Sequence, residues 1–186
     1  MTDLGEQDIA LLAATGAHVV HCPQSNMKLA SGSCPVSRLL AQDVNVALGS
    51  DSAASNNDLN LFGEMQSAAL LAKLRDQDAS ALPAATALEM ATLSGARAMG
   101  LEDRIGSLEV GKLADMIAVD LAQPETQPLY NPLSQLVYAC NGSQVTHSWI
   151  GGVQLLRDRQ LTHIDLPALA GRSRAWRQRI KQTGQT

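Results

Sequence analysis

The chain has 186 residues, 45% of them hydrophobic and 17% charged, which fits one to one and a half domains and excludes a disordered protein. Its net charge of −4 argues against a nucleic acid as a partner of the whole chain. No apolar run approaches the roughly 18 residues of a membrane span, and the acidic N-terminus does not fit a signal peptide, so we expect a cytoplasmic protein without a membrane partner.

Two further features of the composition concern the interior. Aromatic residues make up only 3% of the chain, so we expect a core of Ala, Leu, Val and Met. The three cysteines, Cys22, Cys34 and Cys140, are widely spaced and form no CxxC pair. This spacing indicates neither a disulfide framework nor a structural zinc site, and we expect reduced thiols.

Helical and strand patterns alternate along the first hundred residues. Apolar residues at helical spacing predict helices at residues 6–14, 34–43, 60–75 and 83–100. Two β-rich runs predict strands, at residues 17–23 and 44–49. The second run is apolar at nearly every position, which is typical of a parallel strand buried on both faces. The alternation as a whole is typical of an α/β fold with a parallel sheet.

The pattern changes near residue 105. A strand is predicted at residues 116–119, a proline-marked loop follows it, and residues 145–161 predict a hairpin that turns at Gly151 and Gly152. Residues 166–181 predict a terminal helix, whose five basic residues we interpret as a solvated face. We therefore divide the chain into an α/β part, residues 1–104, and a β-rich part with a terminal helix, residues 105–186.

In the stretch "NVALGSDSAASNND", residues 45–58, the carboxylate of Asp51 lies at the end of the second predicted strand, and small residues come after it. In α/β sheets, functional side chains lie just past the carboxyl ends of strands, where a carboxylate binds a metal or takes a proton. The alternative is that Asp51 caps the next helix. Asp58 lies closer to that helix and fits the capping role better, so Asp51 is a candidate functional residue.

His21, in "HCPQSN", occupies the corresponding position at the end of the first strand. His18 lies three residues earlier, so on a strand the two imidazoles face opposite sides and cannot line one pocket. His21 is the better candidate of the two, although a lone histidine is more often structural. Residues 24–26 either orient a ligand or form a turn, and the turn is favoured. His147 and His163 receive no role.

Four motifs resemble the amidohydrolase superfamily, and most closely its branch of 5-methylthioadenosine/S-adenosylhomocysteine deaminases and related triazine hydrolases. They are "HCPQSNMKLASG", "VALGSDSAASNNDLNLFGEM", "ATLSGARAMGLEDRIGSLEVGKLADMIAVD" and "NPLSQLVY". The second and third are quite specific. The likeness covers most of the chain, roughly from "ALLAATG" to "LLRDRQL".

The resemblance implies the C-terminal part of a (β/α)₈ barrel plus part of a flanking β-sandwich. The strand ending at His21 would be barrel strand seven, and the strand ending at Asp51 would be strand eight. By this likeness Asp51 binds the catalytic metal, contacts the substrate and moves a proton, while Ser55 contacts the substrate and His21 is a further substrate-binding candidate. The implied cofactor is Zn²⁺, or another divalent metal such as Fe²⁺, with one ion per complete site. The implied reaction is hydrolytic deamination of an adenosine-like small molecule.

The chain differs from the family because it lacks most of the family's metal-ligand motifs. The HxH of strand one, the His and Glu of strand five and the His of strand six are not present, and at most three of the eight βα units fit before Arg104. Because catalytic zinc takes three protein ligands, we do not expect this chain alone to hold the metal or to be active. Either an N-terminal segment is missing, or the chain is a non-catalytic remnant that associates with itself as a homo-oligomer. A triazine- or guanine-type hydrolase is the alternative activity.

Overall fold

The computed structural model describes residues 1–183. The chain forms two compact units. Unit 1 contains residues 1–113 and 120–144, and unit 2 contains residues 114–119 and the chain from Val145 onward. The chain thus leaves unit 1 for one short segment and returns to it before unit 2 is completed. Among the described residues, no helix combines the length and the apolar character that crossing a membrane would require.

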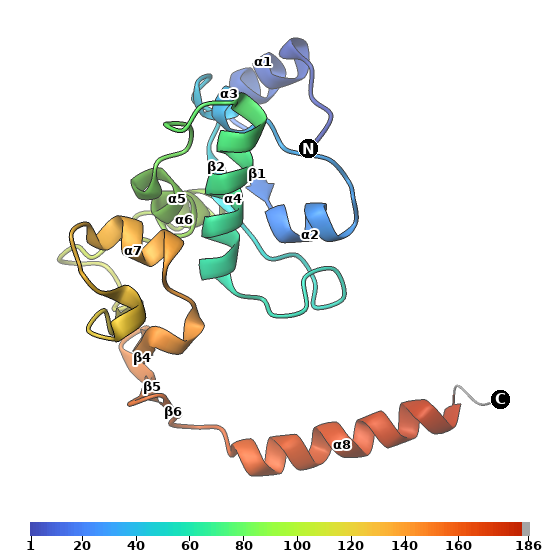
Figure 1. Ribbon diagram of the computed structural model, residues 1–186, viewed down its shortest axis with the longest axis vertical. Coiled ribbons are helices and arrows are strands. Elements are labelled where there is room, and N and C mark those ends of the chain that lie inside the picture. The colour runs from blue at the N-terminus through green and yellow to red at the C-terminus, as the bar shows by residue number, and fades with distance from the viewer. Residues whose placement is uncertain (184–186) are drawn as a thin grey trace. The chain divides into compact units, whose positions relative to one another are not determined.

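Unit 1 consists of helices, of which α4 (Leu61–Asp76) is the longest, around two parallel strands (Figure 1). The strands β1 (Val19–His21) and β2 (Val46–Leu48) pair in parallel along their whole length. The α-helices are α1 (Glu6–Thr15), α2 (Pro23–Lys28), α3 (Val36–Leu40), α4 (Leu61–Asp76), α5 (Ala84–Met90), α6 (Leu93–Ala98) and α7 (Pro132–Tyr138). Two 3₁₀ turns, η1 (Pro124–Thr126) and η2 (Gly142–Gln144), complete the unit. Because α3, α4, α5 and α6 all contact β2, the predicted alternation of helices and parallel strands is confirmed.

The core of unit 1 agrees with the prediction from composition. Its buried cluster consists of Val, Ala, Leu and Met side chains with one Ile and one Cys. All three residues of β2 are buried, as expected of a strand covered on both faces. Helix α4 contributes Met65, Ala68, Ala69 and Ala72 to the cluster, and the three small alanines allow close approach of its neighbours. Cys34 lies in this core, and all three cysteines are free thiols.

The long helix predicted at residues 83–100 is two helices in the structure, so this prediction is wrong. Helix α5 ends at Met90 and α6 begins at Leu93. Between them Thr92 has φ −129° and ψ −92°, outside the helical region. Its hydroxyl donates to the Leu88 carbonyl at 2.8 Å, a local bond that competes with the backbone pattern of a continuing helix.

Two segments that were predicted as irregular are helical. Residues 24–26, expected to form a turn, lie in α2, where Pro23 occupies the first turn and removes one of the N–H groups that a helix start leaves unpaired. The proline-marked loop contains α7, which begins at Pro132 and is capped by Asn131. The Asn131 side chain accepts from the Ser134 N–H at 3.1 Å. An Asn followed by Pro is a sequence signal for a helix start, and this signal was available in the sequence.

The cap of α4 also differs from the prediction. Asn60, not Asp58, is its N-cap, because the Asn60 side chain accepts from the Phe62 N–H at 3.1 Å. Asp58 accepts from the Asn60 N–H at 3.2 Å and so orients the capping residue. Asp51 takes no part in this helix start, which leaves its carboxylate available for another role.

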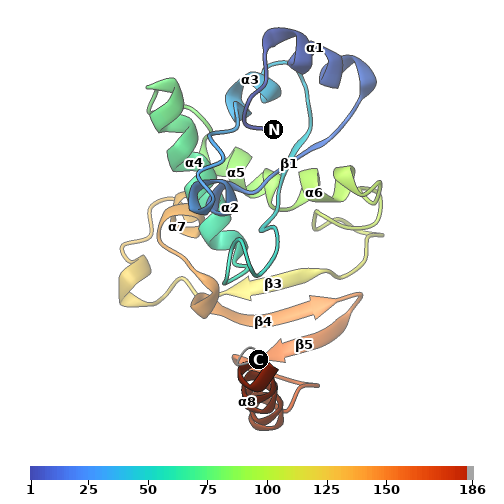
Figure 2. The same ribbon diagram turned by 90° about the vertical axis from the view of Figure 1, so that its right-hand side faces the viewer.

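Unit 2 is an antiparallel sheet followed by a helix, as the sequence predicted. The strands β3 (Met116–Val119), β4 (Val145–Ile150), β5 (Val153–Arg157) and β6 (Gln160–Leu161) lie in that order, and Figure 2 shows β3, β4 and β5 side by side. Strands β4 and β5 form the predicted hairpin, whose turn places Gly151 and Gly152 at positive φ. Helix α8 (Leu166–Thr183) follows the sheet and has no buried residue.

Candidate functional site

The candidate site lies where β2 ends. Three residues after Leu48 the backbone reaches Asp51, which has φ +61°, a left-handed conformation that Asp tolerates better than most residues. Gly49 makes this exit possible, since a Cβ there would lie 2.8 Å from Val20 Cγ1 and 3.2 Å from Cys22 Sγ. The ends of the two parallel strands therefore approach each other closely just before the carboxylate.

Two serine hydroxyls hold one oxygen of the Asp51 carboxylate. Ser25 Oγ, from α2, and Ser55 Oγ, from the loop after β2, each donate to Asp51 Oδ2 at 2.7 Å. Both serines are buried, whereas Asp51 itself is exposed. The hydrogen bonds from Ser55 and Ser25, with one from the Ser52 backbone, lower the pKa of Asp51 below its ordinary value. Asp51 is therefore an accessible carboxylate that stays ionised at neutral pH and has a fixed orientation.

The small residues after Asp51 form a compact turn. The Asn56 N–H donates to the Ser52 carbonyl at 2.9 Å, and Ser52 Oγ lies 3.2 Å from Ser55 Oγ. Lys28, at the end of α2, donates to the Ala54 carbonyl at 2.9 Å and closes the turn from outside. Because the turn is built from short side chains, it brings Ser55 to the carboxylate without covering the carboxylate.

A second carboxylate lies beneath this turn, and sequence reasoning missed it. Glu64, on α4, is completely buried, and its Oε2 accepts from the Gln24 N–H at 3.2 Å. Its Oε1 accepts from Asn56 Nδ2. A signal was available, since Glu64 shares the helical face of the core residues Ala68 and Ala72, where a charge is out of place. Burial raises the pKa of Glu64, while its hydrogen bonds to Gln24 and Asn56 act in the opposite direction.

His21 lies at the end of β1 and is buried, with 3% of its surface exposed. Burial, and after it the positive charge of the amino terminus, lowers the pKa of His21 from 6.5 to about 4. Its imidazole is therefore neutral at neutral pH. Among the described residues, Nδ1 of His21 has no hydrogen-bond partner. His18 lies just before β1 and is exposed, unlike the buried His21.

The described part of the chain does not form a complete metal site by itself. Within residues 1–183, no group of three or more His, Cys, Asp or Glu side chains could hold a metal ion. The accessible and ionised Asp51 has the chemistry of one hard oxygen ligand, and its Oδ1 is not held by the serines. A metal at this carboxylate would need further ligands from outside the described residues.

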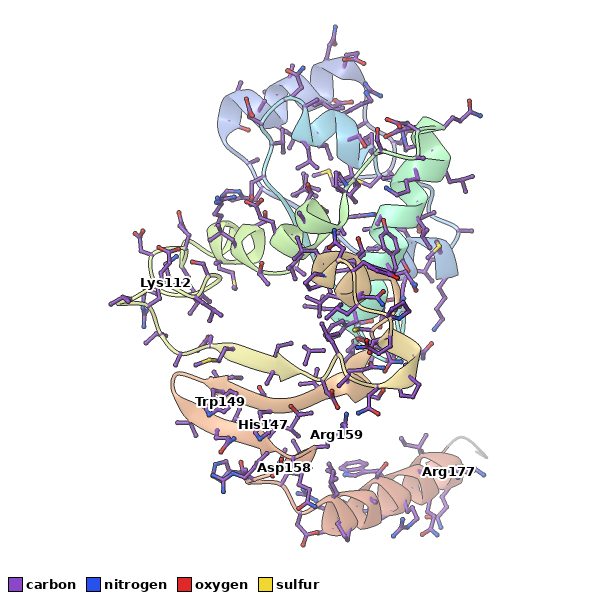
Figure 3. The ribbon with its side chains drawn as sticks, turned by 60° about the vertical axis from the view of Figure 1, so that its left-hand side comes forward. Lys112, His147, Trp149, Asp158, Arg159 and Arg177 are labelled. Atoms are coloured by element: carbon purple, nitrogen blue, oxygen red, sulfur yellow. The ribbon has the colours of Figure 1, made fainter. Side chains whose placement is uncertain are left out.

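Two other features of the molecule do not belong to this site. A hollow of about 300 Å³ lies beside Val44 and Val46, at the opposite end of β2 from Asp51. In unit 2, His147 stacks on Trp149 with ring centroids 5.6 Å apart, and its Nε2 lies 3.5 Å from Asp158 (Figure 3). This group has one histidine and one carboxylate, so it gives no reason to assign His147 a catalytic role.

Comparisons with known proteins find relatives of this chain in sequence and in fold. The family model described as "Amidohydrolase family" matches residues 1–155. A 5-methylthioadenosine/S-adenosylhomocysteine deaminase from Teredinibacter turnerae is 53% identical over 180 residues, which cover 97% of this chain and 41% of that protein. The crystal structure of a zinc-bound adenosine deaminase from Xanthomonas campestris matches with a TM-score of 0.96 and 54% identity, over 98% of this chain and 42% of that one.

A more distant match shows the fold alone. The zinc complex of atrazine chlorohydrolase from Arthrobacter aurescens has a TM-score of 0.88 and 24% identity, over 94% of this chain and 39% of that chain. The chain spans about two fifths of the length of the curated relatives it matches. The family model covers most of the chain, including β1, β2 and the Asp51 turn, and on this evidence the chain belongs to the amidohydrolase family.

Proposed function

We propose that this chain is the C-terminal portion of a metal-dependent aminohydrolase, which hydrolytically deaminates an adenosine-like substrate of the 5-methylthioadenosine or S-adenosylhomocysteine type. The observation that carries the proposal is the exposed Asp51 carboxylate at the end of β2, with one oxygen held by two buried serines. The names of relatives that are more than half identical to this chain support the substrate class.

In this proposal Asp51 has two roles. Its carboxylate is one ligand of a divalent metal, Zn²⁺ or another ion such as Fe²⁺, which when bound would activate the attacking water. Asp51 then accepts a proton from that water and passes it to the departing ammonia. Ser25 and Ser55 keep the carboxylate in one orientation during both transfers, because each donates to Oδ2. Ser55 contacts the substrate, and the neutral His21 imidazole is a further substrate-binding candidate.

The finer architecture is also part of the proposal. Residues 1–104 are the last βα units of a (β/α)₈ barrel, and residues 105–186 are the C-terminal share of the flanking β-sandwich with a terminal helix. The parallel β1–β2 pair supports the first assignment and the antiparallel sheet of unit 2 supports the second. The missing metal ligands would come from an N-terminal segment of the complete protein, whose partner is a purine nucleoside-like small molecule.

A second candidate is a non-catalytic remnant that acts only by associating with itself. Two observations favour it: the described residues hold no group of metal ligands, and unit 2 exposes apolar side chains such as Ile117, Ile150 and Val153. A triazine- or guanine-type hydrolase of the same family is the alternative activity. The triazine hydrolases among the similar structures share the fold at 24% identity.

The proposal is tested by Asp51→Asn in the complete gene product. Without an ionised carboxylate, metal retention should fall, and turnover of 5-methylthioadenosine should drop by at least about a hundredfold, since general acid–base catalysis alone contributes that much. Metal content measured by elemental analysis and ammonia release measured in a coupled assay are the two readouts.

The matched control is Asp58→Asn, which removes an exposed carboxylate from the same loop. Asp58 contacts the Asn60 N–H and not Asp51, so turnover and metal content should stay near those of the wild type. Near-normal turnover in Asp51→Asn would refute the assigned roles. A wild-type gene product that neither binds a divalent metal nor releases ammonia would favour the non-catalytic remnant.

A further inference from the structure

Two dipeptides connect the exposed carboxylate to the buried one. Gln24 and Ser25 are adjacent on α2: the Gln24 N–H donates to Glu64, and the Ser25 hydroxyl donates to Asp51. Ser55 and Asn56 are adjacent in the loop: the Ser55 hydroxyl donates to Asp51, and the Asn56 amide donates to Glu64. Each segment therefore presents one residue to Glu64 and its neighbour to Asp51.

The surrounding contacts fix the positions of both dipeptides. The Asn56 Oδ1 accepts from the Leu59 N–H at 2.6 Å, and Gln24 Nε2 donates to Ser67 Oγ, on α4, at 3.2 Å. Gly63 leaves room for this side chain, because a Cβ there would lie 2.6 Å from Gln24 Nε2. The polar atoms around Glu64 are thus nearly all paired, which is the condition under which a buried carboxylate is tolerated.

We propose that Glu64 is a positioning residue, which sets the spacing of the Ser25 and Ser55 hydroxyls and so holds the Asp51 carboxylate in its working orientation. This inference rests on the function proposed above and deepens it. Glu64 does not touch Asp51, so its effect on the site passes through the two dipeptides.

The chemistry of Glu64 explains why a carboxylate is needed at this position. An ionised carboxylate offers two acceptor oxygens, and Glu64 uses one for a backbone N–H and the other for a side-chain amide. A glutamine of the same shape has one acceptor oxygen and one NH₂ group. If its oxygen accepts from the Gln24 N–H, its NH₂ group faces the NH₂ group of Asn56, and the loop must move.

The first test is Glu64→Gln in the complete gene product, with Glu89→Gln as the matched control. Glu89 is exposed and, within residues 1–183, its carboxylate pairs with Arg97 alone, so its variant should keep wild-type kinetics. Because a small displacement of a reacting group costs up to about a hundredfold in rate, we expect Glu64→Gln to lower kcat roughly ten- to a hundredfold. The KM should rise as well, because the loop that moves carries Ser55, which contacts the substrate in the proposed function.

The second test restores the hydrogen bonds with their polarity reversed. In Glu64→Gln combined with Asn56→Asp, the introduced amide donates to the introduced carboxylate, whose other oxygen still accepts from the Leu59 N–H. In the wild type the Asn56 amide also donates to Gln24 Oε1 at 3.4 Å, and an aspartate at position 56 loses this donor. Gln24 compensates by turning its amide over, so that its NH₂ group donates to the new carboxylate and its oxygen accepts from Ser67 Oγ, which is able to donate as well as accept. The double variant should recover kcat to within about threefold of the wild type, although the buried carboxylate has moved to another residue.

The outcomes separate a positioning role from a role in stability alone. Crystal structures of the Glu64→Gln variant should show that at least one 2.7 Å bond to Asp51 Oδ2 has lengthened beyond hydrogen-bond distance, and metal content per folded protein should fall. If both bonds persist, or if kcat per folded molecule equals that of the wild type, Glu64 is not a positioning residue. If Asp51→Asn leaves turnover unchanged, the proposed function fails instead, and the two bonds to Asp51 still decide the role of Glu64.

Discussion

Unit 1 and unit 2 differ most in what they bury. The buried hydrophobic cluster lies entirely in unit 1, where β2 is covered on both faces. Unit 2 has no buried residue among those that the structure describes, although its sheet has four paired strands. Helix α8 is exposed along its length, including Leu166, Trp176 and Ile180.

The difference shows which unit carries its own stabilising interactions. Burial of apolar surface is the main favourable term in folding, and unit 1 obtains it from its own residues. A sheet and a helix with large apolar side chains in water need a covering surface. This agrees with our proposal that the strands of unit 2, which lie within residues 105–186, belong to one share of a β-sandwich. The candidate site lies in unit 1, the unit with the buried core.

The largest expected effect contrasts a buried leucine with an exposed one. Leu39, on α3, is 0% exposed, so Leu39→Ala should lower the free energy of unfolding by about 2–5 kcal/mol. Leu166, on α8, is 52% exposed, and Leu166→Ala should change it by less than about 0.5 kcal/mol. Urea denaturation of the 186-residue chain gives both values. Equal losses would mean that α8 is packed in solution and would break the comparison.

The next effect is a dependence of stability on pH that originates in unit 1. The pKa of His21 is lowered from 6.5 to about 4 in the folded state, so between these pH values the unfolded chain binds the extra proton. The contribution of His21 to the free energy of unfolding is therefore fully present above pH 6.5. It is lost as the pH falls toward 4, and the total loss is about 3 kcal/mol.

His21→Asn should remove that part of the pH dependence, and the same substitution at the exposed His163 of unit 2 should leave it unchanged. Urea unfolding of the wild type and of both variants, measured from pH 4 to 7, gives the comparison. Parallel curves for the wild type and His21→Asn would show that burial of this imidazole does not control its protonation.

The smallest effect compares the caps of two helices. Asn60→Ala removes the cap of α4, which packs in the core, so the free energy of unfolding should fall by about 1 kcal/mol. Asp165 accepts from the Ala168 N–H at 3.0 Å at the start of α8. Asp165→Ala should reduce the helix content measured by circular dichroism without shifting the urea midpoint. A shift as large as that of Asn60→Ala would show that α8 and unit 1 unfold together.

Local sequence patterns predicted most of the elements, and their failures have local causes. The continuous apolar run at residues 44–49 and the hairpin turn at Gly151 and Gly152 predicted β2 and the β4–β5 pair, because both signals depend on neighbouring residues. The break at Thr92 was missed, since a hydroxyl that bonds back to Leu88 is one of several conformations open to a threonine. Helix α7 was missed because Pro132, at its start, was interpreted only as a loop residue.

The sequence by itself determined the parallel strands, the composition of the core and the position of one carboxylate, Asp51, at a strand end. Only the tertiary structure decided what holds that carboxylate, because Ser25 is 26 residues away from Asp51 and Glu64 is 40 residues away from Gln24. These contacts exist because α2 packs against α4, and such packing depends on the whole core of unit 1. Hydrogen bonds are short and directional, so no pattern within one segment specifies its partners in another.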